Sequence, residues 1–225
     1  MKTPRGTPVV ACIPTIGLSP HLRGLCQSLA MEEVETRIYV NSQSVPNSVV
    51  EDIVAVGWEQ VLHHRPGQSI YQEWNEAAKW ACELDAYLLV LNDDIGVAPY
   101  FAHALGSALD EFESYGLISA DPSHPTPQST LGASPIPSGF KRGDRRAFAN
   151  WAFAARPAAW QMIGDFEIWY GDDHLILQVE RAGWDVGYQR GTGVFHDTSS
   201  TTRQLPWTNE AVARDHVRWA AIPRG

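Results

Sequence analysis

The chain has 225 residues, of which 44% are hydrophobic and 19% are charged, so it can bury one sizeable core but not two generous ones. We therefore expect a single domain over residues 1–225. The net charge of -9 argues against electrostatic adhesion to nucleic acid or to an anionic membrane, although a local basic pocket is compatible with it.

The three cysteines, Cys12, Cys26 and Cys82, are odd in number and have neither CxxC nor metal-ligand spacing. They are predicted to be reduced core thiols, which favours a cytoplasmic location. The sequence shows no basic start followed by an apolar leader, and no apolar run approaches the roughly 18 residues that cross a bilayer. We expect no membrane insertion.

Strands and helices alternate through the first half of the chain. Short apolar runs bounded by turn residues predict strands at 9–14, 37–40, 60–63, 87–91 and 116–120. Apolar residues at helical spacing predict helices at 21–31, 49–56, 69–84 and 100–112. This alternation predicts an α/β fold with a mainly parallel, doubly wound sheet flanked by helices.

The apolar strand at 87–91 ends abruptly in Asn92, Asp93 and Asp94. Open α/β sheets bind ligands at the carboxyl ends of their strands, which is where these side chains should lie. Two adjacent carboxylates repel each other unless a cation or hydrogen-bond donors neutralise them, and Mg²⁺ or Mn²⁺ bridged to a substrate phosphate suits such oxygen ligands. The alternative is that an aspartate here caps a helix spanning 95–110.

Residues 121–147 are predicted to form a flexible loop, because five prolines lie between 121 and 143 among Ser, Thr and Gly. Long loops inside compact domains are often lids or binding loops, and the alternative is a surface excursion. A dense basic cluster at 141–146 includes Arg145. It suits a diphosphate or an anionic acceptor, and the alternative is solvated surface.

The second half of the chain holds a second acidic pair and a terminal histidine. Strands are predicted at 150–155, 184–188 and 194–196, and helices at 156–163, 175–182 and 209–221. Asp172 and Asp173 introduce the helix at 175–182, and His196 ends the last strand. Taken singly, the two acids could cap that helix, and His196 could be a strand-end histidine bonded to the backbone.

The order of these motifs resembles the family 2-like glycosyltransferases of the GT-A fold over most of the chain. Residues 10–15 look like that family's first strand and nucleotide-binding turn, and 67–75 are similar to its turn-plus-helix segment. Asn92, Asp93 and Asp94 fall at the DxD motif. Residues 170–173 fall at the family's Glu-Asp motif, followed by a helix and a Gly-Trp-x-Val-x-Tyr strand at 183–188.

The resemblance implies a GT-A-like domain with a Rossmann-like, mainly parallel mixed sheet. It implies a nucleotide-binding half at about 1–120 and an acceptor and catalytic half at about 148–225. A divalent metal, Mn²⁺ or Mg²⁺, would be held by Asp94 and His196, because Asn92 replaces the first Asp of DxD. The residues expected to contact the nucleotide-sugar donor are Pro14, Thr15, Asn41, Arg65, Gly67, Asn75, Asn92, Asp93 and Arg145.

The family's reaction moves a sugar from the donor to an acceptor hydroxyl. By this resemblance Asp173 is the expected general base, with Asp172 second, in an inverting single displacement. Trp169 and Tyr170 precede the acid pair and are expected to stack on an acceptor sugar ring. The acceptor, whether glycan, protein, metabolite or modified nucleobase, and the oligomeric state stay open at this point.

Two other functions use similar chemistry. A nucleotidyltransferase also binds a nucleotide phosphate through a divalent metal on a similar sheet. Against this function, no glycine-rich, lysine-bearing phosphate loop lies near residue 15. A catalytically inactive nucleotide- or carbohydrate-binding module would account for Asn92 in place of an aspartate. Nucleotide binding without product formation would identify such a module.

Overall fold

The computed structural model describes residues 1–56, 60–121, 148–189, 192–197 and 208–223. Within these ranges seven strands form the main sheet: β1 (Val9–Thr15), β2 (Glu35–Val40), β3 (Gln60–His64), β4 (Tyr87–Leu91), β6 (Tyr115–Ala120), β7 (Ala152–Ala155) and β8 (Asp185–Gln189). The helices are α1 (Leu22–Met31), α2 (Asn47–Val56), α3 (Ile70–Glu83), α4 (Phe101–Glu111), α5 (Gly171–Arg181) and α6 (Thr208–Ala220). A short ribbon pairs β5 (Ile95–Val97) with β9 (Val194–His196).

The strands of the main sheet are ordered β3-β2-β1-β4-β7-β6-β8. Every neighbouring pair is parallel except the two that involve β7, which runs antiparallel to β4 and β6. The chain winds outward from β1 to β2 and β3 and then returns to place β4 on the other side of β1. The predicted mainly parallel, mixed sheet is confirmed, and the strand order reverses between β1 and β4.

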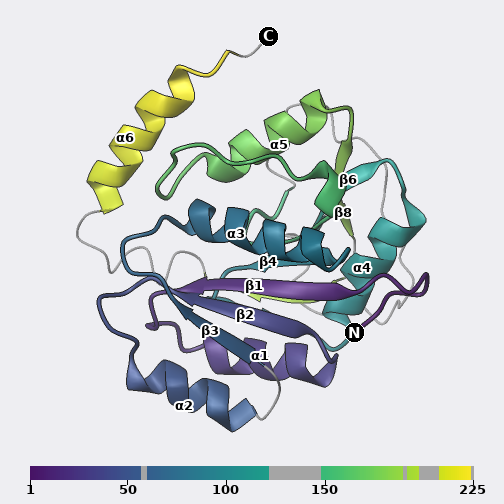
Figure 1. The fold of residues 1–225 in the computed structure, drawn as a ribbon, viewed down its shortest axis with the longest axis vertical. Coiled ribbons are helices and arrows are strands. Elements are labelled where there is room, and N and C mark those ends of the chain that lie inside the picture. The colour runs from purple at the N-terminus through teal and green to yellow at the C-terminus, as the bar shows by residue number, and fades with distance from the viewer. Residues whose placement is uncertain (57–59, 122–147, 190–191, 198–207, 224–225) are drawn as a thin grey trace.

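The sheet is the middle of three layers, with helices on both faces (Figure 1). Successive residues of a strand point to opposite faces, so Ala11 and Ile13 of β1 join the core under α1 while Val10 and Cys12 join the core under α3. The central strands β1 and β4 are buried along their whole length. Burial on both faces explains why their sequences are continuous apolar runs.

Helices α1, α2 and α4 contribute to the core on one face, and α3 and α5 to the core on the other. Helix α3 is the best defined locally, because Ser69 and Gln72 form a capping box at its start. Its inner face carries Trp74, Ala77 and Ala81 against the sheet. Full burial of a large apolar side chain contributes about 1.5–3 kcal/mol, so packing holds this helix more than propensity does.

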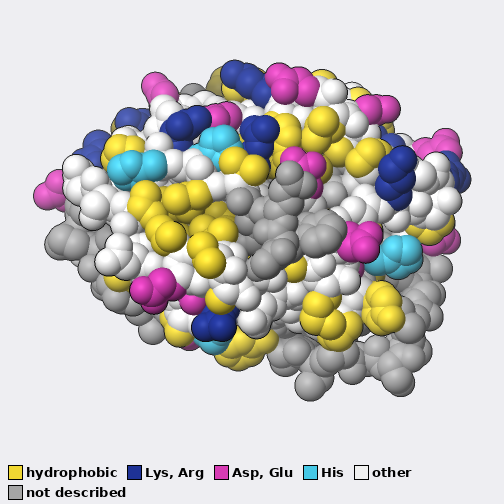
Figure 2. Space-filling view, turned by 60° about the horizontal axis from the view of Figure 1, so that its bottom comes forward, with side chains coloured by type: hydrophobic (Ala, Val, Ile, Leu, Met, Phe, Trp, Pro, Cys, Tyr) yellow, Lys and Arg dark blue, Asp and Glu magenta, His cyan; other side chains and the backbone are white. Residues whose placement is uncertain are grey.

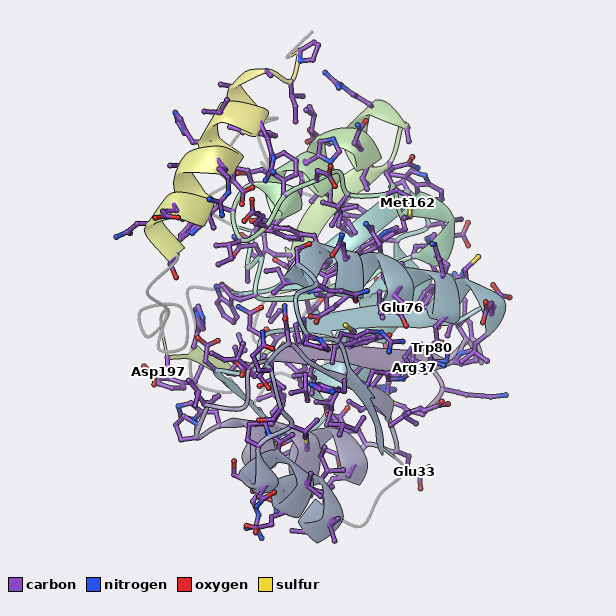
Figure 3. All side chains as sticks on the ribbon, turned by 60° about the vertical axis from the view of Figure 1, so that its left-hand side comes forward. Glu33, Arg37, Glu76, Trp80, Met162 and Asp197 are labelled. Carbon is purple, nitrogen blue, oxygen red and sulfur yellow. The ribbon has the colours of Figure 1, made fainter. Side chains whose placement is uncertain are left out.

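Glu73 also lies on the inner face of α3, where its side chain is completely buried. Neither of its carboxyl oxygens has a hydrogen-bond partner among the described residues. Burial, reinforced by the nearby charge of Glu76, raises its pKa to about 9, so the carboxyl is neutral at physiological pH. Figure 3 shows Glu76 close to Arg37 and Trp80. The guanidinium carbon of Arg37 lies 4.1 Å from the centre of the Trp80 ring, which is a cation–π contact.

Three sequence predictions need correction. Residues 95–97 form strand β5 and the following helix begins at Phe101, so no aspartate caps a helix spanning 95–110. The helix predicted at 156–163 is only one 3₁₀ turn, Pro157–Ala159. Cys12 and Cys26 are buried as expected, but Cys82 is exposed.

Figure 2 brings the side of the molecule that carries α1 and α2 forward and shows hydrophobic side chains exposed on it. Val50 and Val54 of α2 are 43% and 73% exposed. Scattered exposed apolar residues are normal on a protein surface. In the part of the chain that the structure describes, no helix is long and apolar enough to cross a membrane.

Candidate functional site

Several of the predicted site residues lie at the carboxyl edge of the sheet, around the point where strand order reverses. Figure 3 shows Asp197 at this end of the central strands and Glu33, which precedes β2, at the other end. Thr15 ends β1 and donates a hydrogen bond of 2.5 Å from its hydroxyl to Oδ2 of Asp93, which follows β4. This bond spans β1 and β4, where a doubly wound sheet opens its ligand crevice.

Asn41 joins the ends of β2 and β3. Its backbone N–H donates to the Thr15 carbonyl at 2.8 Å, and its side chain accepts from the Gly67 N–H at 2.9 Å and donates to the Gln68 carbonyl. Gly67 has φ +80, a conformation that side chains disfavour, so glycine suits this turn. The amide of Asn41 thus shapes the turn that leads into α3.

Asp94 and His196 come together although 102 positions separate them in the chain. The antiparallel ribbon pairs Ile95, which follows Asp94, with His196. The Asp197 N–H also donates to the Asp94 carbonyl at 2.9 Å. As a result Nε2 of His196 lies 3.3 Å from Oδ1 of Asp94, and the Asp94 side chain is almost completely buried.

The His196 ring is held by Trp151, whose ring stacks on it at 4.5 Å. The Trp151 carbonyl accepts a hydrogen bond of 2.8 Å from the Asn92 N–H, which ties the start of β7 to the acidic segment after β4. Beside this contact, Asp197 lies 3.4 Å from His21. Trp151 therefore connects the two segments that carry the predicted metal ligands.

Asp94 and His196 fit a divalent cation. Oδ1 of Asp94 is buried and forms no hydrogen bond with the described residues, even with the imidazole 3.3 Å away. A carboxylate oxygen and an imidazole nitrogen are both ligands of divalent cations, and these two atoms are close enough to share one. Among the described residues no group of three His, Cys, Asp or Glu side chains could hold a metal, so this pair would need further ligands such as phosphate oxygens.

Asp172 and Asp173 lie inside the first turn of α5, and its N-cap residue, Tyr170, forms no capping hydrogen bond with its side chain. Asp172 accepts hydrogen bonds from Asn150 and, at 3.4 Å, from the Tyr71 hydroxyl. Burial and the neighbouring carboxylate of Asp173 raise the pKa of Asp172. Helix α5 begins at Gly171 rather than at 175, so the two acids lie in its first turn and not at its N-cap. Asp172 also accepts backbone N–H groups of this turn, where a negative charge is favoured, so a role of the acids at the start of the helix stays a prediction beside the catalytic one.

Gly171 fixes how closely α5 approaches α3. A Cβ at this position would lie 2.6 Å from the ring of Tyr71. The Tyr71 hydroxyl donates to the Ile168 carbonyl at 2.8 Å, so the same ring also anchors the loop before α5. Only glycine allows this contact, which places Asp172 beside Asn150.

Trp169 and Tyr170 precede the acidic pair. The Trp169 side chain is 46% exposed and available to a ligand. Tyr170 stacks on Trp219 with ring centroids 5.7 Å apart and an interplanar angle of 6°, and its hydroxyl lies 3.2 Å from Nδ1 of His216. The two aromatic residues thus occupy different environments, with Trp169 turned outward and Tyr170 against α6.

Two other predicted donor contacts have internal partners. The buried amide of Asn75 donates to the Ile163 carbonyl and accepts from the Ile163 N–H and the Trp160 indole, at 2.9, 3.0 and 3.1 Å. Arg65 forms an ion pair of 2.9 Å with Glu76. Asn75 therefore anchors the segment that follows the 3₁₀ turn, and donor contact stays a prediction for both residues.

The remaining predicted contacts divide by position. Pro14 is buried in β1, and Asn92 lies half-buried after β4. Arg145 and the basic cluster around it lie outside the described residues. Four further residues of the site carry no local signal in the sequence, because each acquires its role from a partner that is distant in the chain: Tyr71, Asn150, Trp151 and Asp197.

Solved structures of glycosyltransferases match nearly the whole chain. Glucosyl-3-phosphoglycerate synthase from Mycobacterium tuberculosis, solved with Mg²⁺ and UDP, matches with a TM-score of 0.62 and 12% identity over 98% of this chain and 82% of that one. TarS 1–349 from S. aureus matches with a TM-score of 0.64 and 12% identity over 97% and 67%. GalNAc-T7, solved with UDP, GalNAc and Mn²⁺, matches with a TM-score of 0.63 and 13% identity over 84% and 44%.

Sequence comparison adds no closer relationship, since no family model and no curated protein sequence matches the chain. At 12–13% identity the structural likeness concerns the fold alone. It agrees with the α/β architecture and the mixed, mainly parallel sheet. The chain has the GT-A fold of these glycosyltransferases.

Proposed function

We propose that this protein transfers a sugar from a nucleotide-sugar donor to an acceptor hydroxyl, with a divalent cation bound by Asp94 and His196. The observation that carries the proposal is the 3.3 Å approach of these two side chains at the strand-order reversal. Asp93, which immediately precedes Asp94, accepts a hydrogen bond from Thr15 across the same crevice. The structural neighbours bound to UDP with Mg²⁺ or Mn²⁺ support UDP-sugars as the first donors to test.

Breaking the bond between a sugar and a diphosphate leaves negative charge on the departing oxygens. A bound Mn²⁺ or Mg²⁺ supplies electrostatic stabilisation for that charge. Asp94 and His196 would hold the cation at the carboxyl edge, and Asp93, oriented by the Thr15 hydroxyl, would contact the ribose or the metal. The basic cluster around Arg145 is a further candidate for the diphosphate.

The attacking hydroxyl needs a carboxylate as general base. Asp173 is the first candidate and Asp172 the second, and the contacts of Asp172 support a role for it in the site. Asn150 bonds to its carboxylate and immediately precedes Trp151, which stacks on His196. A raised pKa also makes the Asp172 carboxylate a better proton acceptor.

The first test is a thermal-shift screen of UDP, GDP, CDP and dTDP sugars, each with and without Mn²⁺. A ligand at about 100 times its Kd stabilises the folded state by about 2.7 kcal/mol, so binding is readily detected. We expect stabilisation that requires metal and is strongest for one base. No shift with any donor would refute the proposal, and binding without product would leave an inactive module.

Asp94→Ala and His196→Ala should each remove the metal-dependent part of donor binding. Asp185→Asn is the matched control, because Asp185 is an exposed carboxylate at the start of β8, the opposite end of the sheet. A Mn²⁺ titration of each variant, followed by calorimetry, measures the effect. Unchanged Mn²⁺ dependence in either site variant would remove that residue from the ligand set.

Asp172→Asn and Asp173→Asn separate the two candidate bases. Loss of a general base should lower kcat by about 10²- to 10⁴-fold while donor affinity stays nearly the same. If both variants lose donor binding in parallel with transfer, the acids act through the structure of α5 instead.

Trp169→Ala should raise the acceptor KM without changing donor affinity, since the exposed indole is placed to stack on the acceptor.

A further inference from the structure

A carboxylate of helix α6 binds the backbone of the loop before the acidic pair. Asp215 on α6 is completely buried and accepts backbone hydrogen bonds from Glu167, Ile168 and Trp169, with shortest distances of 3.0, 2.8 and 3.0 Å. These residues belong to neither a helix nor a strand. Buried backbone N–H groups need hydrogen-bond acceptors, and in a helix or strand backbone carbonyls provide them. Here the carboxylate of Asp215 provides the acceptors instead.

The charge of Asp215 is balanced within the same cluster. Arg218 lies 2.9 Å from both Asp215 and Glu167, and Arg214 forms two further bonds to Glu167 at 2.7 and 2.8 Å. Hydrogen bonding to Arg214 and Arg218 lowers the pKa of Glu167 to about 2, so it stays ionised. Two carboxylates and two guanidinium groups therefore hold the loop against α6 without an uncompensated buried charge.

The loop is also held at its end and from its other side. Tyr170 has φ 65, an unfavourable conformation for a residue with a side chain, and its ring is fixed on Trp219 of α6. Tyr71 donates to the Ile168 carbonyl from α3. A strained backbone held from two sides is typical of a segment whose geometry matters to a site.

We propose that Asp215 is a positioning residue that preorganises the acceptor side of the site. It holds residues 167–169 so that Trp169 faces outward and Asp172 enters α5 beside Asn150. This inference rests on the proposed transferase function for its consequence in catalysis. The backbone contacts themselves do not depend on that function, so the two can be tested separately.

Amide hydrogen exchange tests the contacts directly. In the wild-type protein the N–H groups of residues 167–169 should be protected, although they lie outside helices and strands. Asp215→Asn should speed their exchange by about 10- to 100-fold, the loss expected when hydrogen bonds to a charged group are weakened. The matched control is Asp185→Asn, which makes the same substitution at an exposed carboxylate at the start of β8, away from this cluster.

Steady-state kinetics with a donor that binds then test the consequence. Asp215→Asn should lower kcat/KM for the acceptor by about 100-fold, as a displaced reacting group does, while donor affinity changes less than about twofold. A purely structural role predicts loss of donor binding and acceptor use together, which would overturn the proposal. If Asp215→Asn does not fold, fast exchange of these three amides in the wild type would overturn it instead.

The two proposals fail in different ways. A wild-type protein that binds no nucleotide sugar refutes the transferase function, while protected amides that Asp215→Asn releases would still establish the loop contacts. Transfer activity in a protein whose loop amides are unprotected, or unaffected by Asp215→Asn, refutes the positioning role and leaves the transferase function standing.

Discussion

Replacing the buried Glu73 by glutamine should stabilise the protein at neutral pH. Its pKa is raised from 4.5 to about 9 in the folded state, chiefly by burial, so the native protein keeps a proton that the unfolded chain releases above pH 4.5. The stability contributed by this proton is fully present below 4.5 and is lost as the pH rises toward 9. A glutamine side chain has nearly the same shape and does not ionise. Glu73→Gln therefore removes the part of the pH dependence of the unfolding free energy that comes from this side chain.

The magnitude follows from the size of the shift. One pKa unit corresponds to about 1.4 kcal/mol, so between pH 4.5 and 7 wild-type stability falls by about 3 kcal/mol because of Glu73 alone. Glu73→Gln should therefore be more stable than wild type by about 3 kcal/mol at pH 7, a rise of about 6–12 °C in Tm for a chain of this size. The gain should vanish near pH 4.5 and grow toward pH 9.

Urea unfolding followed by tryptophan fluorescence at several pH values between about 4.5 and 9 measures the difference. Groups far from Glu73 titrate equally in both proteins, so the difference reports on this side chain together with its coupling to the neighbouring Glu76. Glu76→Gln should show a pH dependence of opposite sign, because hydrogen bonding to Arg65 lowers the pKa of Glu76 and its stabilising effect is lost as pH falls. The same variant removes the charge that helps to raise the pKa of Glu73, so it also measures the coupling of the two carboxyls. That pair is partly exposed and should contribute at most about 1 kcal/mol.

A stability difference between Glu73→Gln and wild type that does not change with pH would refute this reasoning. That result would mean that the native carboxyl ionises with an ordinary pKa, and hence that water or a partner reaches it. A uniform offset between the two proteins at all pH values, added to the expected pH dependence, would instead measure the burial of an amide without partners.

Single contacts in the structure lead to four more predictions. Asn75→Ala should lower the free energy of unfolding by about 3 kcal/mol in urea, because it leaves buried partners without hydrogen bonds. Gly171→Ala should cost about 1–3 kcal/mol, since its new methyl group would meet the Tyr71 ring; an unchanged urea midpoint would contradict this. Thr15→Val should weaken donor binding about 10-fold by calorimetry, through loss of the bond to Asp93. Cys82 should react with a thiol reagent in the native protein, and the other two cysteines only after unfolding.

Local patterns in the sequence identified most of the architecture. The apolar run at 87–91 is strand β4, and the leucines at 22, 25 and 29 face the core from α1, because burial imposes a period that the sequence must carry. The motif order also led to the GT-A fold. Two three-residue strands show the limit of short patterns: β9 was predicted, whereas no strand was predicted at β5, which only the alternative of a helix over 95–110 covered.

The assembly of the site was decided by tertiary structure. Asp94 and His196 meet because two three-residue strands pair across the fold, and nothing near either residue specifies that pairing. Likewise Asp215 accepts hydrogen bonds from backbone N–H groups 46 to 48 positions away. The sequence around Asp215 does not show which backbone groups it will bind. Periodicity reports which side of an element is buried, whereas a hydrogen bond or a metal pair depends on which elements lie together. That arrangement exists only once the whole chain has packed.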